Sequence, residues 1–282
     1  MEGDGPALRR LLAFVGGDAR HFQIGALSML LAINLAAIDF GARPLASAGA
    51  IGACLGVQVL FSWWKRVPFD LRSPLITGLS LSLLLRAESP WLPALAGLIA
   101  IASKFLLRID GKHLFNPAGF AIVVLLALPA GVWISPGQWG ADLWFATLVG
   151  LVAMLVLQAA RRADIALFFL ASHAALLFAR AAWLGDPLAI PLHQLQSGSL
   201  LIFAFFMISD PRTTPDSRVG RFLLAFAVAA LAYELAFFAQ MRPALYFALI
   251  ALSPATLLID RIFPAARFSW RAPAPAPEGA AS

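Results

Sequence analysis

Ten apolar runs, separated by short stretches that carry most of the charges, constrain this chain more than any other feature of its sequence. Eight of them approach the roughly 20 residues that a helix needs to cross a bilayer. Hydrophobic residues fill 61% of the 282 positions and charged residues 13%, against about 25% in soluble domains. The sequence therefore predicts an integral membrane protein whose main partner is the lipid bilayer. The runs span residues 22–39, 46–64, 74–86, 90–107, 116–130, 139–159, 163–182, 197–209, 220–239 and 243–262.

The positive charges predict the orientation of these segments. If the amino terminus lies inside and the segments alternate, all but four of the 21 lysines and arginines fall on the cytoplasmic side. Such a bias marks cytoplasmic loops. We expect a multi-pass protein of the inner (cytoplasmic) membrane with both termini in the cytoplasm. Because the basic residues lie in short loops, the net charge of +6 does not predict a nucleic-acid partner. The four exceptions are Arg43, Arg86, Arg180 and Arg242.

Two of the runs, 74–86 and 197–209, are clearly too short to span a bilayer as straight helices. Each begins with helix-breaking residues, and each is the third segment in a half of five. Since five is odd, the two halves must insert in opposite orientations, and interrupted helices at matching places are typical of inverted repeats. The alternative is chance similarity among apolar segments. The matching pairs are Thr77-Gly78 with Ser197-Gly198, and Asn116-Pro117-Ala118 with Arg242-Pro243-Ala244.

The predicted fold class is therefore all-α and integral to the membrane. It has about ten transmembrane helices in two inverted repeats of five, each with a short broken third helix. The first repeat covers residues 22–130 and the second 139–262. A cytoplasmic segment, 1–21, precedes them, and a cytoplasmic tail rich in proline and alanine, 263–282, follows them.

Polar residues at the helix starts and inside the segments form a candidate path for a ligand or ion. Helix starts present free backbone N–H groups, which attract anionic or polar atoms, whereas small residues there also allow close helix packing. Asn116 could cap its helix or contact a ligand, and Glu234 could carry a proton or ion or remain neutral and hydrogen-bonded. The candidates are Ser73, Thr77, Gly78, Asn116, Ser197, Gly198, Ser199, Glu234 and Arg242.

Helix length predicts where these residues meet. A helix of about 13 residues covers about 20 Å of a bilayer core of roughly 30 Å, and irregular backbone cannot face lipid. We therefore expect the two short segments to meet near the centre of the membrane. Thr77, Ser197 and Ser199 would line the path there, with Asn116 and Arg242 at its two mouths.

A second polar cluster follows the second short segment on the predicted cytoplasmic side. Arg212 there could hold a phosphate or an acidic group of a partner, while the alternative is a capped turn that positions the broken helix. No metal-ligand spacing, catalytic acid–base pair or nucleotide-binding loop accompanies it, so neither a metal site nor a self-contained enzyme is expected. The motif consists of Asp210, Pro211, Arg212, Thr213 and Thr214.

Three stretches, Phe115–Ala118, Phe206–Pro215 and Ser253–Arg261, resemble the signature sequences of the RnfD/NqrB family. Its members are membrane subunits of the Rnf and sodium-pumping NADH:quinone oxidoreductase complexes. The resemblance covers most of residues 65–265. It implies ten helices in two inverted repeats, a fold similar to that of urea transporters, and partner membrane subunits. It also implies flavin-dependent electron transfer across the membrane, coupled to movement of Na⁺ or H⁺.

One departure from the family concerns its flavin. Electron-transporting members carry FMN on a threonine in the external loop after the fifth helix, but the corresponding residues 130–140 contain no threonine. Covalent FMN is therefore not expected, while a non-covalent flavin stays open. The chain, with its short loops, is interpreted as a stand-alone relative.

Two main functions follow, with a third open. The first is a membrane subunit of an RnfD/NqrB-like electron-transfer system, with cation translocation as a candidate coupled process. The alternative is a channel or transporter for a small solute or ion, on the same scaffold without redox chemistry. An accessory membrane protein that serves one biosynthetic pathway is the third.

Reporter fusions test the predicted topology. A reporter fused at Gly17 and another fused to the tail should both report a cytoplasmic location, because the charge bias places both ends inside. A periplasmic signal from the tail would mean an odd number of spans and would contradict the inverted repeat.

Overall fold

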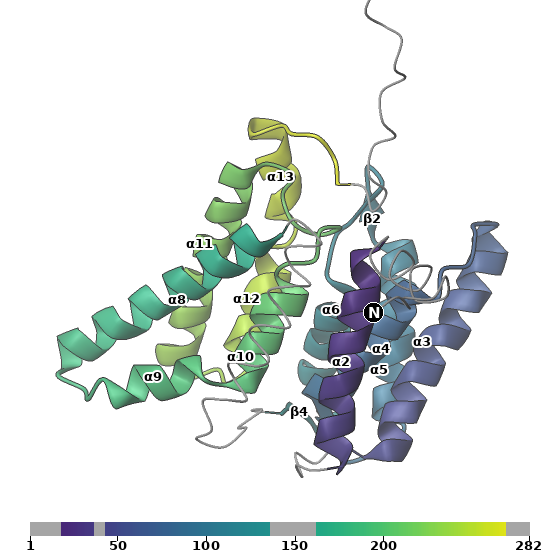
Figure 1. Cartoon of the computed structure of the whole chain (residues 1–282), viewed down its shortest axis with the longest axis horizontal. Coiled ribbons are helices and arrows are strands. Elements are labelled where there is room, and N and C mark those ends of the chain that lie inside the picture. The colour runs from purple at the N-terminus through teal and green to yellow at the C-terminus, as the bar shows by residue number, and fades with distance from the viewer. Residues whose placement is uncertain (1–17, 37–42, 136–161, 269–282) are drawn as a thin grey trace, which may run out of the picture.

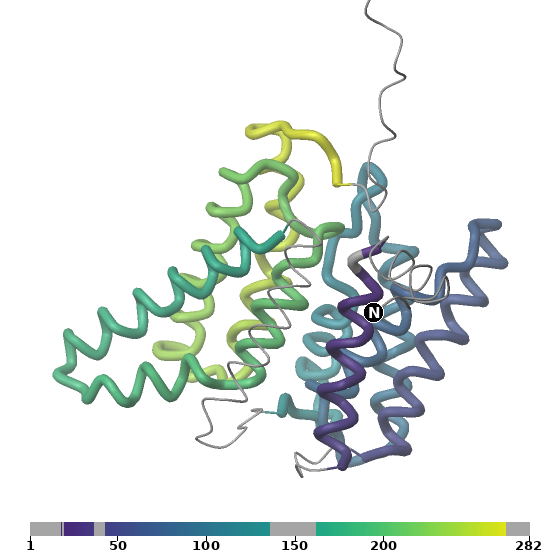
Figure 2. The backbone as a smooth tube through the Cα atoms, in the orientation of Figure 1, coloured from purple at the N-terminus to yellow at the C-terminus, as the bar shows by residue number. Residues whose placement is uncertain are grey.

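The computed structural model of the chain describes residues 18–36, 43–135 and 162–268, and these are mostly helical (Figures 1 and 2). The predicted segment 139–159 lies outside the described residues. Two groups of helices stand side by side in Figure 1, one from each half of the chain. We call them the first and the second helix group.

The first helix group consists of five helices. Helix α3 packs against both α4 and α5, α2 packs against α4, and α5 packs against α6. The bounds are α2 Ala19–Ala36, α3 Pro44–Lys65, α4 Arg72–Leu84, α5 Leu92–Leu106 and α6 Pro117–Leu126.

The second helix group is centred on α11, which packs against α8 and α12. It meets the first group where α12 packs against α6. The bounds are α8 Ala163–Leu184, α9 Ala189–Leu195, α10 Gly198–Ile202, the π-helix η1 Phe203–Met207, α11 Arg218–Phe237, α12 Ala244–Leu252 and α13 Ala255–Ile262.

Three described helices, α3, α8 and α11, are each long and apolar enough to cross a membrane. Two further spans arise if each bent pair counts as one: α9 with α10 and η1, bent by 50°, and α12 with α13, bent by 51°. Helices α5 and α6 are apolar but shorter. The protein is thus a helical membrane protein with three to five candidate spans among its described residues.

Local sequence explains where several helices begin and end. The Ser217 hydroxyl caps α11 by accepting a hydrogen bond from Gly220 N at 3.0 Å. Pro44 occupies the first turn of α3, where its missing N–H costs nothing. Helix α8 stops at Gly185, whose φ of 73° suits glycine.

The described residues are mostly helical, as predicted, but they also include four short strands that the all-α prediction did not foresee. Strand β1 (Leu85–Ala87) pairs antiparallel with β4 (Val132–Ile134), and β2 (Arg108–Ile109) pairs with β3 (Lys112–His113). Helix α4 is too short to cross a bilayer, and the chain continues from its end as the extended strand β1. Pairing with β4 satisfies the backbone N–H and C=O groups of β1, which would otherwise be left without partners. The turn between β2 and β3 is Asp110-Gly111, with φ values of 51° and 79°, as tight hairpins require.

One helix break lies where it was predicted, at Ser197-Gly198, and the other two places differ from the prediction. The first short segment is one continuous helix, and its expected lead, Ser73-Pro74, lies inside the first turn of α4, where proline is tolerated. In the second half the break falls between α9 and α10, just before Gly198. The segment 243–262, predicted as one span, bends at Ser253-Pro254, because proline cannot donate to the preceding turn.

Glycines allow α3, α4 and α5 to pack closely. A Cβ at Gly78 would lie 2.8 Å from Ile51 Cα, and a Cβ at Gly97 would lie 2.7 Å from Ala50 O. Both contacts are to backbone, which cannot move aside as a side chain can. Gly78, predicted as a path residue, therefore serves helix packing.

Gly97→Ala is expected to destabilise the first helix group, because its methyl group would collide with the Ala50 carbonyl. We expect a loss of about 1–3 kcal/mol, seen as a lower thermal-unfolding midpoint in detergent. Gly52→Ala on the same bundle is the control, since nothing lies within 4 Å of its added Cβ. A Gly97→Ala protein as stable as Gly52→Ala would contradict the packing argument.

Candidate functional site

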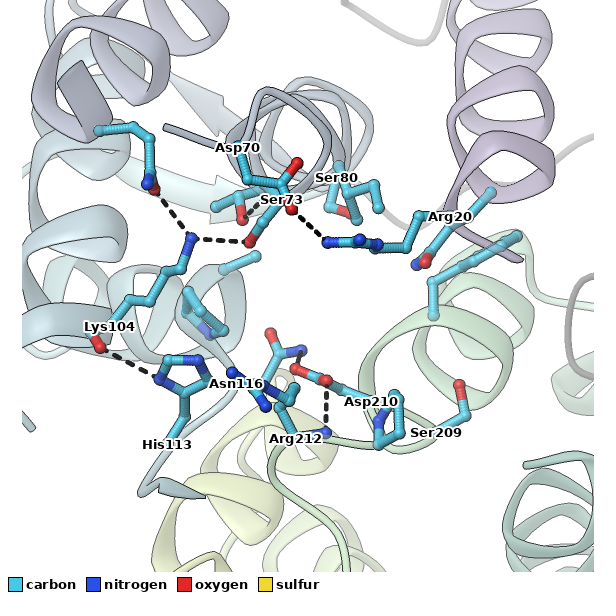
Figure 3. A pocket seen from close by; sticks show the side chains of 18 of the residues that line it. Arg20, Asp70, Ser73, Ser80, Lys104, His113, Asn116, Ser209, Asp210 and Arg212 are labelled. Atoms are coloured by element: carbon cyan, nitrogen blue, oxygen red, sulfur yellow. Dashed lines mark hydrogen bonds and ion pairs between the residues drawn. The ribbon is translucent and has the colours of Figure 1, made fainter. Parts of the chain in front are cut away.

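A polar cavity of about 350 Å³ lies between the two helix groups, near β2 and β3, which contribute Arg108 and His113 to its lining (Figure 3). We call it the inter-group cavity. Its walls come from the starts of α2, α4 and α6, the inner faces of α3 and α5, and the turn that follows η1. Segments that are more than 100 residues apart in sequence thus share one space.

Two arginines and two aspartates form an ion-pair network at one side of the cavity. Arg20 lies 2.6 Å from both Asp18 and Asp70, and Arg72 lies 2.7 Å from Asp18 and 2.9 Å from Asp70. Burial alone would raise the pKa of Asp70, but hydrogen bonds from Arg72 and Arg20 outweigh it and lower the pKa to about 2. The network ties the start of α2 to the α3–α4 connection.

Lys104 reaches the cavity from the last turn of α5. Its ammonium donates hydrogen bonds to Gln58 Oε1 at 2.8 Å and to Ser73 Oγ at 2.9 Å. Figure 3 shows it on the opposite side of the cavity from Asp210. Both acceptors are neutral, and no carboxylate among the described residues is bonded to this ammonium.

His113 lies below Lys104 and is neutral. Burial lowers the pKa of His113 to about 3, and the positive charges of Arg212 and Lys104 act in the same direction. Its Nδ1 lies 3.1 Å from the Lys104 carbonyl oxygen, which can only accept, so Nδ1 carries the proton. The ring thereby ties the β3 loop to the end of α5.

Asn116 connects the two helix groups across the cavity. Its Oδ1 accepts from Gly119 N at 3.0 Å and caps α6, while its Nδ2 donates to Asp210 Oδ2 at 3.3 Å. Burial raises the pKa of Asp210, even though Arg212 N and Asn116 donate hydrogen bonds to its carboxyl group. The Asn116 side chain thus caps α6 and also links the first helix group to the second.

The stretch Asp210–Thr214 is a capped turn between η1 and α11. Arg212 N donates to Asp210 Oδ1 at 3.0 Å, and Thr213 Oγ1 donates to Asp210 O at 3.3 Å. Thr256, at the start of α13, donates to Thr213 O at 3.2 Å. The Arg212 side chain lines the cavity, while Pro211 and Thr214 are buried in the turn.

A lysine joins the same turn to the first helix group. Lys112 Nζ lies 3.0 Å from Asp216 Oδ2 and 2.5 Å from Asp260 Oδ2, and Asp216 N donates to Asp260 Oδ1 at 2.8 Å. We call these three residues the lysine clasp. The Asn116–Asp210 and Thr256–Thr213 contacts bring the three signature stretches to one place, and Asp260 of the clasp belongs to the third of these stretches.

The helix before the turn is unusual. Residues Phe203–Met207 form a π-helix, in which Ile208 N donates to Phe203 O at 3.0 Å. The Ser209 hydroxyl donates to Phe205 O at 2.6 Å and satisfies one of the carbonyls there. Such π turns occur frequently at functional sites.

A second cavity, of about 980 Å³, lies among α9, β4 and the start of α12. Ser197, Ser199 and Arg242 line it, together with His173 and Tyr246.

The predicted path residues therefore separate into three sets. Ser73, Thr77 and Asn116 line the inter-group cavity, so Thr77 does not share a lining with Ser197 and Ser199. Gly198 is buried, and Glu234 lies on an exposed face of α11 and lines neither cavity.

Sequence reasoning did not select Arg20, Gln58, Lys104 or His113 as lining residues. A cation within a predicted membrane segment, as Lys104 is, was the signal that could have found one of them. Within the described ranges, no three His, Cys, Asp or Glu side chains come close enough to hold a metal ion.

These features define a class: a multi-pass helical membrane protein with interrupted helices and a polar cavity between two helix groups. The sequence profile of the NQR2, RnfD, RnfE family matches residues 128–269, half of the chain, and the chain belongs to that family.

Two relatives are each named as a subunit of an ion-translocating oxidoreductase complex. The one from Alcanivorax borkumensis is 36% identical over 81 residues, which cover 28% of this chain and 24% of the relative. The one from Stutzerimonas stutzeri is 37% identical over 71 residues, which cover 25% of this chain and 20% of the relative. The chain thus matches a quarter or less of the length of these relatives.

The structure allows one test of the flavin that the family resemblance implies. The structure describes residues 130–135 of the loop 130–140. These residues include β4, which pairs with β1. Ser135 carries the only hydroxyl in the loop and is 4% exposed. A covalently attached FMN does not fit the described part of this loop.

Acidification is expected to destabilise the protein through His113. The unfolded chain binds a proton at a histidine near pH 6.5, whereas folded His113 does so only at about 3. Because the unfolded state binds more protons between these values, stability falls as the pH is lowered through that window. In detergent, the unfolding midpoint should fall less from about pH 7.5 to about pH 5 in His113→Asn than in the wild type.

His193→Asn, on the exposed face of α9, is the matched control and should keep the wild-type pH response. Identical pH responses of His113→Asn and the wild type would contradict the assignment of a neutral His113.

Proposed function

We propose that this protein is a membrane subunit of an electron-transfer system related to the ion-translocating oxidoreductase complexes. The observation that carries the proposal is the meeting of the three signature stretches. Asn116 of the first stretch bonds to Asp210 of the second, and Thr256 of the third donates to the Thr213 carbonyl oxygen of the second. Beside them, Lys112 and Asp216 both bond to Asp260 of the third stretch. The relatives' names, which assign them to a complex of this kind, support the same role. Partner membrane proteins follow from that assignment.

The proposal includes ten helices in two inverted halves, in the inner membrane with both termini in the cytoplasm. Two placements support it. The Asn-Pro-Ala start of α6 lines one cavity and the matching Arg-Pro-Ala start of α12 lines the other, at opposite ends of the molecule. Exposed tryptophans also stand at helix ends, as residues of interfacial aromatic belts do: Trp63 in the last turn of α3, Trp91 just before α5 and Trp183 in the last turn of α8.

In this proposal, the two cavities are the two mouths of a path across the membrane. Ser73, Thr77 and Asn116 would face the cytoplasmic mouth, and Ser199 and Arg242 the external one. Between them lie α10 and η1, whose irregular backbone is enclosed by protein, as a membrane interior requires. Coupled cation movement is part of the proposal, with Asp210, which accepts from Asn116 of the first group, as the candidate acid.

The alternative function is a channel or transporter for a small solute or ion, without redox chemistry. The absence of threonine from residues 130–140 favours it, because the family resemblance implies an FMN attached to a threonine in that loop. A cavity at each end of the interrupted helix is also what alternating access would use.

Purification from the native membrane tests the two functions. The electron-transfer role predicts that other membrane proteins co-purify and that the complex shows the visible absorption of a flavin. After denaturation, this chain should have its unmodified mass, because no threonine stands in the loop that would carry FMN.

A colourless protein without partner proteins that conducts solutes in liposomes would establish the alternative. An added FMN mass on any threonine would contradict the absence of a covalent flavin.

A further inference from the structure

The inter-group cavity has an excess of positive charge. Its two aspartates are occupied: Asp70 is held by Arg20 and Arg72, and Asp210 accepts from Asn116 and from Arg212 N. The ion-pair network of Asp18, Arg20, Asp70 and Arg72 is neutral as a whole. The remaining cations that line the cavity, Lys104, Arg108 and Arg212, therefore outnumber the one remaining acid, Asp210.

The donors of these cations are only partly used. Lys104 has three N–H donors, and two of them reach Gln58 and Ser73. The backbone N–H of Arg212 bonds to Asp210. The Arg212 guanidinium itself makes no hydrogen bond or ion pair with any described residue. Bringing cations together without acids is costly, so a ligand that neutralises them would stabilise the site.

The starts of two helices add to the positive electrostatic potential in the cavity. Asn116, Pro117 and Ala118 line the cavity from the start of α6, and Ser73 lines it from the first turn of α4. The positive ends of two helix dipoles thus point toward the space that the cations border.

The rest of the lining is apolar. Ile76, Phe105, Phe205 and Phe206 complete the walls of the 350 Å³ cavity. That volume is at the small end of ligand pockets and greatly exceeds that of a bare anion. A fitting occupant has one anionic head and one apolar part.

We propose that the inter-group cavity binds a phosphate ester, whose phosphate group is held between Lys104 and Arg212 and whose apolar part lies against the phenylalanines. A guanidinium and an ammonium on separate elements suit the several oxygens of a phosphate group. The ester is either a soluble cytoplasmic molecule or a phospholipid whose headgroup enters the cavity. This inference does not depend on the proposed electron-transfer role.

Thermal unfolding of the purified protein in detergent tests the site with inorganic phosphate as the probe. Phosphate should raise the unfolding midpoint above that measured in chloride at the same ionic strength, because it binds the folded state. Arg212→Gln should weaken the phosphate response about tenfold or more, since it removes a charge-assisted contact. We expect this variant to keep the fold, since the turn uses only the backbone N–H of Arg212, and its unfolding midpoint without phosphate checks this.

Lys104→Gln should have the same effect on phosphate binding, and Arg261→Gln is the matched control. Arg261 is an exposed arginine of α13 that does not line the cavity, so its variant should respond to phosphate like the wild type. An equal phosphate response in the Arg212, Lys104 and Arg261 variants would overturn the proposal, as would no response in the wild type.

Native mass spectrometry of the same proteins separates the two sources. A bound phospholipid that is present in the wild type and absent from Arg212→Gln assigns the site to a lipid headgroup. A phospholipid retained in that variant, together with a lost phosphate response, assigns the site to a soluble phosphate ester.

Discussion

The arrangement of the two helix groups depends on the lysine clasp. Lys112 belongs to the first group, while Asp216 and Asp260 belong to the second, and all three side chains are largely removed from solvent. A buried ion pair adds little stability over an apolar contact, but loss of one partner costs about 3–5 kcal/mol because a charge remains buried without compensation. The clasp therefore fixes the position of one group on the other. The inter-group cavity exists because that position leaves the polar ends of both groups facing each other.

Much of the helical framework could be predicted from the sequence. Lipid requires long uninterrupted apolar runs, so the bounds 46–64, 163–182 and 220–239 fall within two residues of α3, α8 and α11. The predictions were wrong where the chain bends or changes form. A run of apolar residues does not reveal that the chain becomes extended at Leu85. Nor does it reveal that Pro254 bends a segment that is long enough to span a membrane.

The site was less predictable, because its contacts are made across the fold. Asn116, Asp210 and Arg212 could be selected, since each stands beside a proline at the edge of an apolar run. Lys104 falls inside its apolar run, but it stands close to the cations of the loop that follows and was grouped with them. Its partners Gln58 and Ser73 are 46 and 31 residues away in sequence, and no local pattern links them to it. Burial of the neutral His113 likewise follows from the packing of the loop rather than from its composition.

The π-helix η1 has a consequence for how such a site changes over evolutionary time. Each residue of an α-helix turns the chain by about 100°, and a π turn holds one residue more than an α turn. Residues after Met207 are therefore rephased around the helix axis relative to an uninterrupted α-helix. The direction in which the Asp210 carboxylate faces is thus set by the number of residues in this segment more than by their identity. Insertion or deletion of a single residue there would rotate the following side chains, including Asp210, around the helix axis and so change which of them face the cavity. Substitutions that keep the residue number would leave the direction of the Asp210 side chain unchanged.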